Sequence, residues 1–230
     1  MNICCAILIA LAALVLSPGL THFRTTVKDL QGARTSFRGI RSSYDGGSKV
    51  VKLLAVHGIG NHAVGYSITL SDGVASRLGF KQVGTHQDFK LGLSVLTADK
   101  PHANLRRLTY AAGDRRLEIF EVTWSPLVEG FKQDFLLKYE AQHSGERALI
   151  NRYIKSALVD DNLSDAVIYL GASGAYMRNA VKETVCRMVN GTIAGALDQE
   201  RCIDPSLEAD AAVAMVSFSL GSKITFDSIN

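Results

Sequence analysis

The chain has 230 residues, of which 47% are hydrophobic and 20% are charged. This length and composition are typical of one substantial folded domain and argue against a largely disordered chain. The net charge is only +3 and the sequence contains no basic block, which argues against a protein that tracks the nucleic-acid backbone.

The N-terminal segment differs from the rest of the chain. An unbroken apolar run from Ile3 to Leu16 is followed by the small-residue stretch 17–19. The run is shorter than the roughly 20 residues that span a bilayer, and its length suits the apolar region of a secretory signal. We therefore expect residues 1–19 to be a signal peptide or a membrane anchor, with a buried core helix as the alternative. The protein would then be exported (secreted or periplasmic), or membrane-associated through residues 3–20.

The cysteines leave two alternatives open. Cys186 and Cys202 could form a disulfide in an exported chain, or they could remain two buried thiols. Their spacing shows no metal-site pattern, because no Cys-x-x-Cys or clustered histidine accompanies them. We therefore expect no metal and no other cofactor.

Short apolar runs alternate with helical patterns from residue 48 onward, whereas residues 20–47 are polar and are predicted to be a linker or peripheral segment. Strands are predicted at 50–56, 91–96, 117–124, 166–170 and 211–218, and helices at 66–78, 127–159 (a helical pair), 177–189 and 223–229. This alternation predicts an α/β domain over residues 48–230, with a mostly parallel sheet and helices on both faces. The pair at 127–159 is a candidate helical lid over an apolar substrate, or an ordinary pair of sheet-covering helices.

A serine at a strand-to-helix boundary carries the strongest chemical signal. The stretch Ser217-Phe218-Ser219-Leu220-Gly221 follows an apolar strand and precedes a helix. A nucleophile elbow holds its serine in a strained conformation at such a bend, so the residues two positions away must be small. Gly221 satisfies this requirement, and Ser217 stands where the usual motif has glycine. Ser219 is therefore the candidate nucleophile.

A second motif, His57-Gly58-Ile59-Gly60, ends the first predicted strand. Together with the elbow Ser219-Leu220-Gly221-Ser222, it resembles the α/β-hydrolase superfamily of lipases and esterases. The resemblance implies that backbone amides of both motifs form an oxyanion hole. Its donors would be the N–H of Ile59 or Gly60 and the N–H of Leu220, each worth about 3 kcal/mol in the transition state. His57 and Gly58 would support the motif, with His57 as a structural residue rather than a general base.

The other members of a catalytic triad are missing from the expected positions. The resemblance implies the order nucleophile, acid, histidine, but after Ser219 come eleven residues with Asp227 and no histidine. Asp227 is predicted two turns into a helix, pointing away from the site. Three explanations stay open: a fragment that exposes an unpaired sheet edge, an upstream histidine that acts as base, or an inactive hydrolase-like protein.

Two functional hypotheses follow. The first is a serine hydrolase that transfers the acyl group of a carboxylic ester, lipid-like esters included, to Ser219. The second is a non-catalytic exported or membrane-associated binding protein that lacks a complete triad. A nucleotide-binding protein is a poor alternative, because Gly221-Ser222-Lys223 lacks the order of a P-loop.

Overall fold

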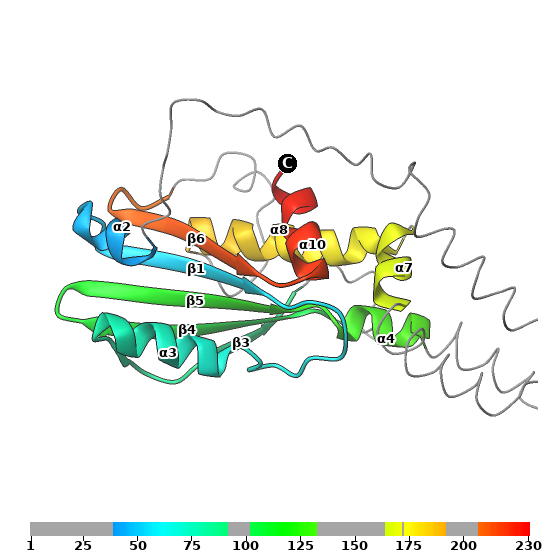
Figure 1. Ribbon diagram of the computed structural model, residues 1–230, viewed down its shortest axis with the longest axis horizontal. Helices are drawn as coiled ribbons and strands as arrows, with labels where there is room; N and C mark the ends of the chain where they lie inside the picture. Colours follow the sequence, from blue (N-terminus) through cyan, green and yellow to red (C-terminus); the bar gives the residue numbers. More distant parts are fainter. Residues whose placement is uncertain (1–38, 92–101, 133–163, 172, 192–206) are drawn as a thin grey trace, which may run out of the picture. The chain divides into compact units, whose positions relative to one another are not determined.

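The computed structural model describes residues 39–91, 102–132, 164–171, 173–191 and 207–230 (Figure 1). The chain divides into two compact units, Met1–Phe37 and Arg38–Asn230, and every described residue belongs to the second. The predicted signal or anchor therefore lies outside the described residues. Among the helices that are described, none is long and apolar enough to cross a membrane.

The described strands form one mixed sheet in the order β2-β4-β5-β1-β6, with β3 also paired to β4. The strands are β1 (Val50–Val56), β2 (Lys81–Gln82), β3 (Gln87–Lys90), β4 (Asn104–Ala112), β5 (Arg115–Thr123) and β6 (Ala211–Ser217). β1 pairs in parallel with both β5 and β6, whereas β4 pairs antiparallel with β2, β3 and β5. The described sheet is therefore mixed and not mostly parallel as predicted, because the tight turn between Ala112 and Arg115 makes β4 and β5 an antiparallel hairpin.

Helices cover both faces of the sheet, as predicted for an α/β domain. The helices are α2 (Arg41–Asp45), α3 (Ile68–Leu78), α4 (Pro126–Lys132), α7 (Ser164–Leu170), α8 (Gly174–Asn190) and α10 (Leu220–Ile229). One hydrophobic core joins the sheet to α8 and α10, and a second core joins the opposite face to α2 and α3. The fold class is thus confirmed at the level of an α/β domain with helices on both faces.

β1 is the centre of this arrangement. All seven of its residues are buried, which fits the continuous apolar character of a parallel strand covered on both faces. Lys52 is the one charged residue of β1. Its side chain is 1% exposed, and its Nζ lies 3.4 Å from Glu208 Oε1. The carboxyl end of β1 leads into the glycine turn, and the carboxyl end of β6 leads into α10 beside it (Figure 1).

The predicted strand at 166–170 is wrong, because these residues form helix α7. A short apolar run fits a strand and a buried helix turn equally well, so its period could not decide between them. Ser164 and Asp165 directly precede the run, and such residues favour a helix N-terminus. Packing of α7 against α4 and α8 completes the helical assignment.

The predicted linker at 20–47 is also corrected at its C-terminal end. Residues 41–45 form α2, and Tyr44 is 3% exposed in the core beneath it. The Tyr44 hydroxyl donates a hydrogen bond of 3.0 Å to the Arg116 carbonyl. The domain therefore starts before residue 48, because one aromatic side chain anchors an otherwise polar segment.

Three further strands of the described sheet, β2, β3 and β4, were not predicted. β2 and β3 are short and exposed, and β4 carries adjacent Arg106 and Arg107, which interrupt a period-two pattern. The predicted strand at 91–96 lies outside the described residues except for Leu91. Of the predicted helical pair at 127–159, α4 is described and residues 133–159 lie outside the description.

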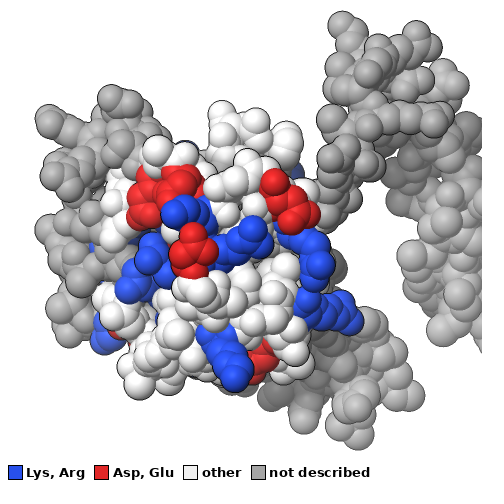
Figure 2. Space-filling model, turned by 90° about the vertical axis from the view of Figure 1, so that its left-hand side faces the viewer, with Lys and Arg blue, Asp and Glu red and all other residues white. Residues whose placement is uncertain are grey.

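Charges of both signs are interleaved at the end of the sheet that carries the β4–β5 hairpin (Figure 2). Lys49 Nζ lies 3.4 Å from Asp114 Oδ2, and Arg116 Nε lies 2.9 Å from Glu118 Oε1. Lys49 and Arg116 therefore each have a neighbouring carboxylate, and this face carries charges of both signs.

Candidate active site

Ser219 lies at a sharp bend between β6 and α10. Its φ of 49° and ψ of −123° make it the one described residue other than glycine with a positive φ. Such a conformation costs an L-residue about 1–3 kcal/mol, which the surrounding structure must offset. The strand, bend and helix predicted here are all observed, and Ser219 is exposed to solvent.

The bend is packed directly against the glycine turn that follows β1. A Cβ on Gly58 would lie 3.1 Å from the Ser219 Cβ. A Cβ on Gly221 would overlap the His57 carbonyl group, whose carbon would lie 2.9 Å away. Gly221 therefore has no room for a side chain, and a side chain at Gly58 would require the Ser219 bend to move by a few tenths of an ångström. Two motifs that are far apart in sequence are in contact, as the prediction requires.

His57 is buried and fully engaged beneath the turn. Its Nε2 accepts the Trp124 backbone N–H at 3.1 Å, and its Nδ1 lies 2.8 Å from the Gly58 carbonyl oxygen. The Trp124 indole stacks on the imidazole with ring centroids 4.3 Å apart. Burial lowers the pKa of His57 from 6.5 to about 3, so the ring is neutral and its proton lies on Nδ1. Both ring nitrogens are thus committed to the backbone, which fits a structural role.

The orientation of the peptide planes in the turn determines which backbone N–H groups can bind a substrate. His57 Nδ1–H donates to the Gly58 carbonyl, so the Ile59 N–H of the same trans peptide points away from the buried ring. The Gly60 N–H donates to Asp165 Oδ2 at 2.6 Å. Within the described part of the chain, no acceptor takes the N–H of Ile59 or of Leu220. Of the three predicted donors, Ile59 and Leu220 are therefore open and Gly60 is occupied.

The rest of the turn is tied to the segment that follows β5. The His62 N–H donates to Ser125 Oγ at 3.2 Å, and the Ser125 hydroxyl lies 3.0 Å from the His62 carbonyl oxygen. The Asn61 amide donates to Glu129 Oε2 on α4 at 2.9 Å. His62 Nε2 also lies 3.3 Å from the Ile59 carbonyl oxygen. The side chains of Ser125 and Glu129 therefore hold residues 61 and 62, which continue the turn.

The part of the chain that the structure describes places no base in contact with the Ser219 hydroxyl. Among the described residues, none forms a hydrogen bond with the Ser219 hydroxyl. Asp227 is engaged elsewhere: Lys223 Nζ donates to its Oδ2 at 2.6 Å, and the Tyr169 hydroxyl donates to the same carboxylate. The Lys223 ammonium holds the pKa of Asp227 below its ordinary value. Asp227 therefore belongs to an ion pair on α10, away from the triad role.

The residues that hold the turn were not identified from the sequence. Trp124 directly follows β5, and Asp165 lies at the start of α7; both segments were predicted from their apolar residues. The hydrogen bonds of these two side chains join segments that are far apart in the chain. Asp165 did offer one local signal, since an acidic residue after Ser164 is typical of a helix N-terminus. Lys132, whose Nζ lies 2.7 Å from Asp165 Oδ1, offered no signal, because a basic residue at the end of a helix is ordinarily solvated.

The described residues contain no group of three His, Cys, Asp or Glu side chains that could hold a metal ion. No family model, no curated protein and no solved structure matches the chain. A functional conclusion must therefore be built on the geometry of the Ser219 bend and the glycine turn.

Proposed function

We propose that this chain is a serine hydrolase of the α/β-hydrolase type, in which Ser219 takes the acyl group of a carboxylic ester. The observation that carries the proposal is the strained backbone of Ser219 at a strand-to-helix bend packed on the Gly58 turn. Strained residues of this kind cluster at functional sites, where the surrounding structure holds them in place. The exposed position of Ser219 leaves its hydroxyl open to a substrate.

The proposed reaction uses two open amides. Ser219 Oγ attacks the ester carbonyl carbon, and the carbonyl oxygen becomes an oxyanion that accepts hydrogen bonds from the N–H groups of Ile59 and Leu220. Leu220 is the first residue of α10, so the positive end of that helix adds to the stabilisation. The alcohol then leaves, and water releases the acid from Ser219.

The Ser219 proton needs an acceptor. His57 cannot serve, because its Nε2 lone pair is occupied by the Trp124 N–H and its pKa is low. Among the described residues, no side chain hydrogen-bonds the Ser219 hydroxyl, so the proposal leaves the base and its acidic partner unassigned. A serine without such a base is a weak nucleophile, which makes the reaction testable.

A fluorophosphonate probe tests the proposal directly. We expect the full chain to be labelled at one site, and Ser219→Ala to abolish labelling. Ser222→Ala is the matched control, since Ser222 is an exposed serine on the same helix whose hydroxyl donates to the Ser217 carbonyl at 3.0 Å. Labelling that survives Ser219→Ala, or a folded wild-type chain that resists the probe, would contradict the proposal. Hydrolysis of p-nitrophenyl esters with short and long acyl chains then identifies the substrate class.

The alternative is a non-catalytic hydrolase-like binding protein. Two observations favour it: within the described residues the Ser219 hydroxyl has no base, and the Gly60 amide is occupied by a carboxylate. A chain that binds a long-chain ester without hydrolysing it, and that resists the probe while folded, would support this alternative.

We further propose that the protein is exported or membrane-associated. Cys186 is disulfide-bonded. Disulfides persist mainly in oxidising compartments, in keeping with the apolar N-terminal run.

A further inference from the structure

Asp165 is a buried carboxylate at the start of α7. Its side chain is 0% exposed, its Oδ2 accepts the Gly60 N–H at 2.6 Å, and its Oδ1 lies 2.7 Å from Lys132 Nζ. Lys132 is the last residue of α4 and is 8% exposed. One carboxylate thus connects two helices to the glycine turn.

A buried ion pair at this place requires a reason beyond stability. Removing two charges from water is costly, and apolar residues of similar size are often equally stable or better. The carboxylate here is aimed at a backbone amide of the turn that packs on Ser219. Lys132 neutralises it, so the site keeps its preference for a developing negative charge.

The contact with Asp165 completes the orientation of a single peptide plane. The plane between residues 59 and 60 has its N–H bonded to Asp165 and its carbonyl oxygen 3.3 Å from His62 Nε2. Gly60 has a φ of 98°, so this plane could rotate more freely than one at an ordinary residue. The Ile59 N–H belongs to the preceding plane, which His57 Nδ1–H holds through the Gly58 carbonyl oxygen. The contact with Asp165 therefore fixes the second of the two planes that meet at the Ile59 Cα.

We propose that Asp165 is a positioning residue: by holding the Gly60 N–H, it fixes the turn so that the Ile59 N–H faces the reacting carbonyl group at Ser219. Lys132 compensates the charge of Asp165 without touching the turn. This inference rests on the proposed function for its catalytic consequence, whereas the hold on the Gly60 amide is independent of it.

The test uses the full chain and three variants. Asp165→Ala removes the acceptor. Asp165→Asn keeps an acceptor oxygen but leaves Lys132 unpaired, and Asp165→Asn combined with Lys132→Met keeps the acceptor in a neutral pair. Asp114→Asn is the matched control, because Asp114 forms an exposed ion pair with Lys49 on the β4–β5 hairpin. Fluorescence of Trp124 verifies that each variant is folded.

Two readouts separate positioning from stability. We expect Asp165→Ala to shift the Gly60 and Ile59 amide proton resonances and to slow fluorophosphonate labelling of Ser219 at least about tenfold. The double variant should return both readouts close to wild type, because the acceptor atom is what matters. A merely structural role would lower the melting temperature without changing the labelling rate of the folded protein.

The possible failures are distinguishable. Unchanged Gly60 and Ile59 resonances in Asp165→Ala, or a double variant as slow as Asp165→Ala, would overturn the role of Asp165. If Asp165→Ala does not fold, the comparison of Asp165→Asn with the double variant decides, since only the latter should react at the wild-type rate. If wild-type Ser219 does not react, the proposed function fails, and the amide resonances alone decide whether Asp165 holds the turn.

Discussion

At the scale of single residues, the site depends on a histidine that is neutral near neutral pH. His57 is 1% exposed and stacks on Trp124, which is the single tryptophan of the chain. Protonation of Nε2 would leave two donors facing each other, because the Trp124 N–H already points at that nitrogen. The low pKa of His57 therefore results from its burial.

This pKa predicts a pH dependence of stability. The folded pKa of about 3 lies below the unfolded value of 6.5, so between these values the unfolded chain binds one more proton. The contribution of His57 is fully present above about pH 6.5 and is lost as the pH falls toward 3. The slope is at most about 1.4 kcal/mol per pH unit.

Urea unfolding followed by Trp124 fluorescence at several pH values measures this loss. An NMR titration of the His57 imidazole, assigned with His57→Gln, should show a neutral ring down to about pH 4. A midpoint between pH 6 and 7 would contradict the buried, engaged histidine.

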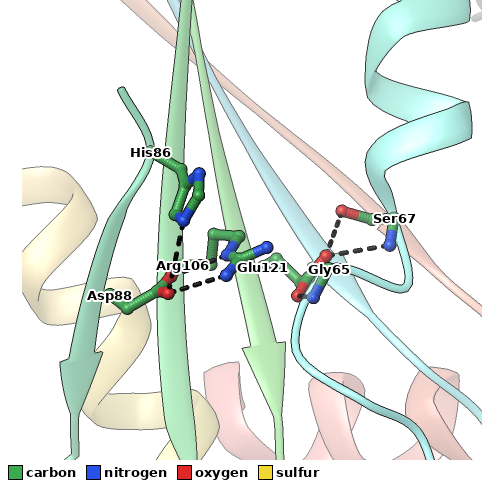
Figure 3. A network of polar contacts seen from close by, with 6 residues as sticks. All are labelled: Gly65, Ser67, His86, Asp88, Arg106 and Glu121. Atoms are coloured by element: carbon green, nitrogen blue, oxygen red, sulfur yellow. Dashed lines mark hydrogen bonds and ion pairs between the residues drawn. The ribbon is translucent and has the colours of Figure 1, made fainter. Parts of the chain in front are cut away.

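At the scale of elements, a buried glutamate on β5 holds the segment that leads into α3 (Figure 3). Glu121 Oε2 accepts the Ser67 backbone N–H at 2.8 Å and the Ser67 hydroxyl at 2.6 Å, and its Oε1 accepts the Gly65 N–H. Ser67 is the N-cap residue of α3, a position at which the helix dipole favours a negative charge. Arg106 lies beside this group and forms an ion pair with Asp88 on its other side.

We predict that Glu121→Gln lowers the free energy of unfolding by about 2 kcal/mol, because the amide nitrogen of glutamine would face backbone donors that the carboxylate now satisfies. Asp88→Asn is the control in the same network. Asp88 is 45% exposed, and we expect its loss to cost less than about 1 kcal/mol. Denaturant midpoints of the two variants check the prediction, and equal losses would contradict it.

At the scale of the whole molecule, β6 combines a strand composition suited to burial with an open edge. In the described sheet β6 pairs with β1 alone. Its residues from 211 to 216 are all apolar, yet Val213 and Met215 are 38% and 39% exposed. Edge strands are ordinarily protected by charge, proline or a bulge, and β6 has none of these.

We therefore predict that the protein self-associates through β6. Met215→Lys should lower the association measured by sedimentation over a range of concentrations, and should change the free energy of unfolding by less than about 1 kcal/mol. Val83→Lys is the control, since Val83 is 45% exposed but lies beyond β2. A wild-type chain that stays monomeric, or an equal effect of the control, would contradict this role of β6.

Sequence alone was sufficient for the elements with strong local patterns. The apolar runs of β1 and β6, the helical pattern of α8 and the bend at Ser219 all appear where expected. These features are local, because burial on both faces demands apolar residues and a tight bend demands small ones. Where the pattern was short, as in α7, packing against other helices decided the structure.

The candidate site shows the same division. Ser219, Gly58 and Gly221 could be read from the sequence, because each occupies a backbone conformation or a close contact that few residues tolerate. Only the tertiary structure shows that the Gly60 N–H is bonded to Asp165. This bond leaves the Ile59 N–H as the candidate oxyanion donor of the turn. A hydrogen bond between residues 105 positions apart leaves no periodic trace in a sequence, since only the folded chain brings the donor to its acceptor.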